Sequence, residues 1–90
     1  MRLVWRQTAL NDRSKIMDHI ILHNPEAAIA LDEIFELKAE NARQRPTLYR
    51  KGKVPGTREI VATSNYVMIY LIADEAVEMV RLIHARQRWP

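Results

Sequence analysis

The sequence predicts a single α+β domain over residues 1–90, in which an N-terminal helical hairpin packs on a small, mostly antiparallel sheet in the order β-α-α-β-β-β. The apolar run at residues 66–72 is too short for a helix and predicts a strand covered on both faces. Two earlier segments carry apolar residues at helical spacing, and their short connection predicts an antiparallel hairpin. Three strand-like runs separated by tight turns then predict a meander. Ninety residues leave room for one domain.

The first strand is expected at residues 2–7, where apolar and polar side chains alternate. Thr8 is predicted to cap the first helix, which would begin at Ala9 and place Asp12 as an acid in its first turn. One apolar stripe at helical spacing follows from Leu10, Ile16, Met17, Ile20 and Ile21.

The second helix is expected from Pro25 to Arg43, with Asn24 as its N-cap. Proline suits the first helical position because the N–H it lacks has no partner there. Small alanines would permit close approach to the first helix. The bulk of the buried face is assigned to Leu31, Ile34, Phe35 and Leu37.

Residues 47–56 contain both glycines of the chain and are predicted to form an ordered loop with turns. The strands of the predicted four-stranded sheet that follow this loop are expected at residues 58–62, 66–72 and 76–84. The turns between them fall at residues 63–65 and 73–75.

Composition excludes several classes of protein. The chain has no cysteine, which excludes a disulfide framework or a thiolate metal site. Its N-terminus lacks the apolar segment of a signal peptide, and no apolar run approaches the ~20 residues that span a bilayer. A cytoplasmic protein without a membrane partner is therefore expected.

The net charge is +3, but the basic residues are clustered. No acid interrupts a first basic series, which consists of Arg43, Arg45, Arg50, Lys51, Lys53 and Arg58. A second group closes the chain and consists of Arg81, Arg86 and Arg88. Such clustering suits an anionic partner, either a nucleic acid or an acidic protein segment. A solvated surface explains charge alone at least as well.

Five segments, in this order and spacing, resemble the RelE/ParE superfamily of toxins from type II toxin–antitoxin pairs. They are VWRQTALND, HNPEAA, GTREI, YVMIY and VRLIHARQRWP, and together they extend over essentially the whole chain. The resemblance implies a β-α-α-β-β-β toxin that a cognate antitoxin wraps, without a cofactor, and that meets operator DNA only through the antitoxin. Within the superfamily, RelE-like toxins cut mRNA on the ribosome, whereas ParE-like toxins bind and block DNA gyrase.

Cleavage of RNA needs a base for the 2′-OH, cations for the phosphorane and an acid for the leaving oxygen. The candidates for these roles are Arg58, Arg81, His84 and Arg86. The resemblance to RelE is incomplete, because Val67 stands where RelE has an arginine after the tyrosine. The chain also lacks the terminal catalytic tyrosine, and Trp89 cannot replace its proton chemistry.

We therefore expect gyrase inhibition by the ParE-like route, with ribosome-dependent mRNA cleavage as the alternative. A degenerate member that binds only its antitoxin is a third possibility. Binding of target or antitoxin is assigned to Lys51, Lys53, Arg81, Arg86, Arg88 and Trp89. His84 is more readily explained as a structural residue. No metal site is expected, since His19 and His23 lack a third ligand. Glu59, next to Arg58, could act as a base, but an ordinary cross-strand ion pair explains it as well.

Overall fold

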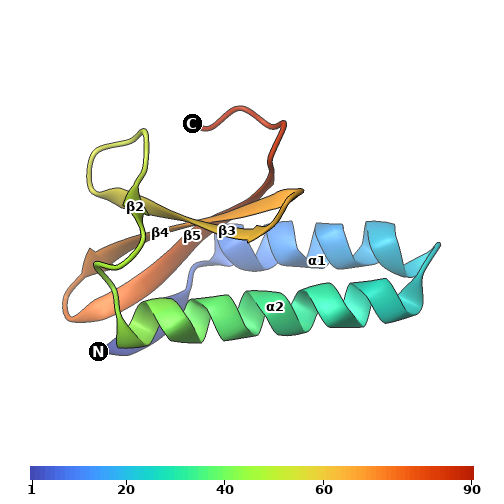
Figure 1. Ribbon diagram of the computed structural model, residues 1–90, viewed down its shortest axis with the longest axis horizontal. Helices are drawn as coiled ribbons and strands as arrows, with labels where there is room; N and C mark the ends of the chain where they lie inside the picture. The colour runs from blue at the N-terminus through green and yellow to red at the C-terminus, as the bar shows by residue number, and fades with distance from the viewer.

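The structure is a computed structural model that describes residues 1–90. Its elements in chain order are β1 (Arg2–Trp5), α1 (Gln7–Ile21), α2 (Pro25–Gln44), β2 (Arg50–Lys51), β3 (Thr57–Thr63), β4 (Tyr66–Ala73) and β5 (Ala76–His84). The helical hairpin covers one face of the sheet, and the C-terminal segment lies on the other side (Figure 1). The predicted α+β fold with a helical hairpin is confirmed.

The sheet contains five strands in the order β1-β5-β4-β3-β2, one more than the sequence predicted. The additional strand is β2, which lies inside the predicted loop and pairs Arg50 with Glu59 and Lys51 with Arg58. Two exposed, charged residues carry no alternation of apolar and polar side chains, so no sequence pattern indicated this strand. All neighbours are antiparallel except β1 and β5, which are parallel.

Helix α1 begins earlier than predicted. Its N-cap residue is Arg6, which provides no capping side chain, and Thr8 lies inside the helix, so the prediction of Thr8 as N-cap was wrong. The first turn consequently contains no acid. Thr8 has another partner, because its hydroxyl donates a hydrogen bond to the carbonyl of Val80 on β5 at 2.6 Å. Tertiary packing, and not local capping, therefore explains this threonine.

Helix α2 begins as predicted. Asn24 accepts a hydrogen bond from the backbone N–H of Ala27 at 3.1 Å, and Pro25 occupies the first helical position. The buried positions of the helix are Ala28, Leu31, Phe35, Ala39 and Ala42. Leu37 was expected among them but is 59% exposed. Three alanines in the buried set allow the helix backbone to pack close to the sheet.

The core lies between the hairpin and the sheet and is built from Ala9, α2 and the helix-facing side chains of β3, β4 and β5. In β4, Met68 and Tyr70 face the helices, and Ile69 between them is buried on the opposite face. The prediction that this strand is covered on both faces is thus confirmed at its centre. Its end is more open, since Ile72 is 38% exposed. No helix is both long enough and apolar enough to cross a membrane.

Strand β5 extends beyond the end of β1, where Trp5 pairs with Met79. Helix α1 takes over as the neighbour of the free strand edge. Besides the Thr8 hydroxyl, the Asp12 carboxylate accepts a hydrogen bond from the backbone N–H of Leu82 at 3.0 Å. Side chains one helical turn apart thus complete the hydrogen bonding of β5.

Candidate functional site

The four residues predicted to perform RNA cleavage do not share one surface. Alternation along the strands places Arg58 on β3 and His84 on β5 toward the helices, because they share a face with the core residues Ile60 and Leu82. Arg81 points to the opposite face of the sheet. Arg86 lies beyond the end of β5 and is exposed. The structure therefore does not gather these four side chains around one reacting group.

The guanidinium of Arg81 is engaged by Asp12. Nε lies 2.7 Å from Oδ2 and Nη2 lies 3.1 Å from Oδ1, which is a two-point ion pair. Hydrogen bonding to Asp12 raises the pKa of Arg81 further above its ordinary value. Because the same carboxylate binds the N–H of Leu82, the pair joins α1 to β5. Nothing local in the sequence indicated this contact, since the partners are 69 residues apart.

His84 holds the turn that follows β5. Its Nδ1 accepts a hydrogen bond from the backbone N–H of Arg86 at 3.1 Å, and its own backbone N–H donates to the Gln87 side chain at 3.1 Å. The imidazole also stacks edge-to-face on Tyr66, with ring centroids 5.4 Å apart. This geometry agrees with the structural interpretation of His84, while a role in proton transfer stays a prediction.

The C-terminal segment folds over the sheet face away from the helices. The Trp89 ring lies 5.7 Å from the Arg81 guanidinium carbon, and its indole N–H is buried without a hydrogen-bond partner. A small cavity of about 150 Å³ lies beside Trp89 and includes Lys53, Arg50 and Glu59. Arg50 and Glu59 form the cross-strand ion pair expected for Glu59, at 3.0 Å. Arg86 and Arg88 remain exposed.

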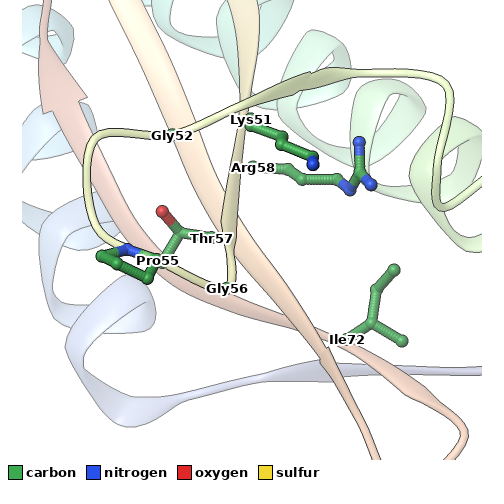
Figure 2. Close-up of a pocket in the computed structure, with 7 residues that line it drawn as sticks. All are labelled: Lys51, Gly52, Pro55, Gly56, Thr57, Arg58 and Ile72. Atoms are coloured by element: carbon green, nitrogen blue, oxygen red, sulfur yellow. The ribbon is translucent and has the colours of Figure 1, made fainter.

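A larger cavity of about 470 Å³ lies at the start of β3, where Lys51 on β2 and Arg58 on β3 stand directly opposite each other on neighbouring strands. Figure 2 shows both side chains extending in the same direction from β2 and β3, with Ile72 on the same side. Neither cation has a carboxylate within ion-pair distance. Arg58 instead donates from Nη1 to the carbonyl oxygen of Tyr49 at 2.7 Å. We call this the Lys51–Arg58 pocket.

The loop that closes this pocket is fixed by Thr57. Its hydroxyl and its backbone N–H both donate to the carbonyl of Val54, at 2.7 and 3.1 Å, and its own carbonyl accepts from the N–H of Gly52 at 2.8 Å. A Cβ at Gly52 would lie only 2.3 Å from the Thr57 hydroxyl oxygen, so this position requires glycine. Gly56 has a φ of +86°, a backbone conformation that also favours glycine.

The two helices are joined by a second ion-pair cluster that sequence reasoning did not identify. Arg13 on α1 lies 2.6 Å from both Asp32 and Glu36 on α2, and its guanidinium carbon is 4.7 Å from the Trp5 ring centroid. Burial alone would lower the pKa of Arg13, but hydrogen bonds to the two carboxylates outweigh it and raise the pKa. This cluster joins the two helices of the hairpin. Because two carboxylates already neutralise Arg13, the cluster is not a candidate binding site for anions.

The two helical histidines do not form part of a larger ligand set. The rings of His19 and His23 meet edge-to-face with centroids 6.2 Å apart. No group of three or more histidine, aspartate or glutamate side chains gathers at any point of the structure in a way that could hold a metal ion.

Comparison with known proteins places this geometry in a family. Residues 3–89 match the family model of the ParE toxin of the type II toxin–antitoxin system parDE. The alignments with two curated relatives cover nearly the whole length of both chains. A putative toxin, Y4kP, of Sinorhizobium fredii is 30% identical over 99% of this chain and 93% of its own length. Toxin RelE2 of Caulobacter vibrioides is 32% identical over 93% of this chain and 94% of its own.

Two solved structures share the fold. One is described as a chromosomal ParDE toxin–antitoxin system from P. aeruginosa. It aligns with a TM-score of 0.83 and 20% identity, over 93% of this chain and 95% of the other. A YoeB/ParE toxin from Agrobacterium tumefaciens aligns with a TM-score of 0.65 and 16% identity, over 93% and 98% of the two chains. The nearly complete match to the family model decides the assignment: the chain belongs to the ParE toxin family of type II toxin–antitoxin systems.

Proposed function

We propose that this protein is a growth-inhibiting toxin that binds and blocks DNA gyrase, and that a cognate antitoxin neutralises it. The observation that carries the choice of a binding toxin over a nuclease is the separation of the candidate catalytic side chains. Arg81 is held by Asp12, and the Nδ1 of His84 is occupied by the N–H of Arg86. Arg58 is anchored on β3, which β4 separates from Arg81 and His84 on β5. General acid–base catalysis requires such groups to converge on one substrate.

The helical hairpin supports an antitoxin as the second partner. A cavity of about 350 Å³ runs between α1 and α2 and is walled by the apolar side chains of Met17, Ile21, Ala28 and Ile29. Leu22, at the tip of the hairpin, is 80% exposed. An exposed apolar groove between helices is a suitable site for the apolar face of an amphipathic helix. We assign this groove to the antitoxin.

The test is a gyrase supercoiling assay with the purified toxin, run beside an mRNA cleavage assay on translating ribosomes. We expect supercoiling to be lost while mRNA stays intact, and the cognate antitoxin to restore supercoiling. Cut mRNA with active gyrase would contradict the proposal and favour a ribosome-dependent mRNA interferase. Absence of both activities in a correctly folded sample would instead indicate a member that only binds its antitoxin.

A matched pair of variants sharpens the same assay. Arg86 and Arg88 are exposed and make no ion pair, so Arg86→Ala combined with Arg88→Ala removes charge with little loss of packing. We expect this double variant to inhibit gyrase more weakly at an unchanged melting temperature. Lys15→Ala, on the exposed surface of α1, is the control and should inhibit like the parent protein. Equal inhibition by the tail variant would remove the basic tail from the binding surface.

A further inference from the structure

We infer that the Lys51–Arg58 pocket is a binding site for a carboxylate side chain from an acidic, extended segment of a partner protein. The inference starts from an electrostatic imbalance. Like charges directly opposite each other on neighbouring strands destabilise a sheet, and Lys51 and Arg58 form such a pair. On the adjacent pair of residues of the same two strands, Arg50 is balanced by Glu59. A bound anion would provide the missing balance.

The two cations are presented in a way that suits recognition of a carboxylate. Arg58 uses Nη1 to bind the Tyr49 carbonyl, which fixes the guanidinium plane and leaves its other N–H groups free of protein partners. A fixed guanidinium binds a carboxylate with less loss of side-chain freedom than a mobile one. Lys51 is exposed beside it, so its ammonium group can complete the contact from the second strand.

The rest of the pocket favours a protein segment over a nucleic acid. None of its seven lining residues is aromatic, so it offers no aromatic ring on which a base could stack. Pro55 and Ile72 add apolar surface beside the cations, and this suits the apolar neighbour of an acidic residue in a peptide. The loop is also held in place by the Thr57 hydrogen bonds, so little ordering is needed on binding.

This inference adds a binding site to the proposed function. It rests on that function in one respect, which is that the partner is a protein. It can be tested on the isolated full-length chain without gyrase. The probe is a blocked tetrapeptide of alternating glutamate and leucine, titrated into the ¹⁵N-labelled protein and followed by NMR. The matched peptide with glutamine in place of glutamate, inorganic phosphate and a single-stranded oligonucleotide are titrated separately.

We expect the acidic peptide to shift the amide signals of residues 51–58 with saturation, and the glutamine peptide to leave them unchanged. Lys51→Met keeps the aliphatic stem of an exposed side chain and should weaken binding about fivefold. Lys15→Met removes the same charge from α1 and should bind like the parent chain. Because Lys51 is exposed, the variant is expected to fold, and circular dichroism checks this.

Three results would overturn the inference. Equal shifts by the glutamine peptide would show that charge is not recognised, and unchanged affinity in Lys51→Met would remove the pocket from the contact. Tighter binding of the oligonucleotide at the same amides would make the site one for nucleic acid. A different result would reject only the proposed target. If the parent chain binds the acidic peptide but does not inhibit gyrase in the separate supercoiling assay, gyrase is not the target and the pocket is still a peptide-binding site.

Discussion

Asp12 and Arg81 form the one ion pair of this fold that also completes the backbone hydrogen bonding of the sheet. The carboxylate binds the Arg81 guanidinium at 2.7 and 3.1 Å and accepts the backbone N–H of Leu82 at 3.0 Å. The Asp12 side chain is only 15% exposed, whereas that of Arg81 is 31% exposed. The two partners therefore contribute unequally to stability, because Asp12 also accepts a hydrogen bond from a backbone group that water cannot easily reach.

This inequality makes a prediction about stability. Asp12→Ala leaves the N–H of Leu82 without its acceptor and should lower the free energy of unfolding by about 1–3 kcal/mol. Arg81→Ala leaves that hydrogen bond in place and should cost about 1 kcal/mol or less, as is usual for a partly exposed pair. Urea unfolding of both variants measures the difference. An equal or larger cost for Arg81→Ala would contradict the structural role given to Asp12.

The core makes a second prediction. Phe35 is fully buried against the sheet and stacks edge-to-face on Tyr66, with ring centroids 6.1 Å apart. Phe35→Ala should lower the free energy of unfolding by about 3–5 kcal/mol, through lost burial and the cavity it leaves. Leu37→Ala is the matched control two residues away, and should change stability by about 0.5 kcal/mol or less because Leu37 is mostly exposed. Thermal or urea unfolding of the pair tests which face of α2 is buried.

The sequence predicted the elements of this fold better than their contacts. Apolar periodicity identified both helices and the three long strands within a few residues, because each buries a continuous face. It could not identify β2, whose two residues are charged and exposed. It also placed the N-cap at Thr8 because local capping chemistry favours threonine there, whereas the Thr8 hydroxyl donates to the carbonyl of Val80 on the neighbouring strand β5. Contacts between distant segments have no local signature.

For the same reason, the sequence indicated the basic regions of the chain but not the contacts that their side chains make. Clustered basic residues drew attention to residues 50–58 and to the end of the chain. Only the structure shows which of these cations are already neutralised, since Arg81 is paired with Asp12 and Arg50 with Glu59. Lys51 and Arg58 are adjacent through strand pairing alone. Charge along the chain indicates a basic region, but register decides which charges meet.

Tyr70 makes a prediction about pH. Its buried hydroxyl donates a hydrogen bond to the Pro46 carbonyl at 2.5 Å, so Tyr70→Phe should cost about 1 kcal/mol at neutral pH. Burial raises the pKa of Tyr70 above its ordinary value of 10.0, although the charge of Arg58 opposes the shift. A raised folded-state pKa means that this stabilisation is fully present below pH 10 and is lost as pH rises through the folded-state pKa.

The measurement is urea unfolding of the parent chain and of Tyr70→Phe at about pH 7 and at about pH 11. We expect the parent chain to lose more stability than the variant between the two conditions, so that the difference between them shrinks. A difference that is constant with pH would show that the phenol is not held protonated by the folded protein.

The loop of the Lys51–Arg58 pocket makes the last prediction. A Cβ at Gly52 would lie 2.3 Å from the Thr57 hydroxyl oxygen and 3.3 Å from its Cβ. The hydroxyl cannot turn away without losing its hydrogen bond to the Val54 carbonyl, so Gly52→Ala should cost about 1–3 kcal/mol through overpacking. Thr57→Ala removes the oxygen and with it the 2.3 Å contact, and leaves the looser contact of 3.3 Å with the Cβ. The double variant Gly52→Ala, Thr57→Ala should therefore be more stable than the sum of the single losses predicts. A double-mutant cycle by urea unfolding measures this coupling, and strictly additive losses would show that the two side-chain positions do not meet.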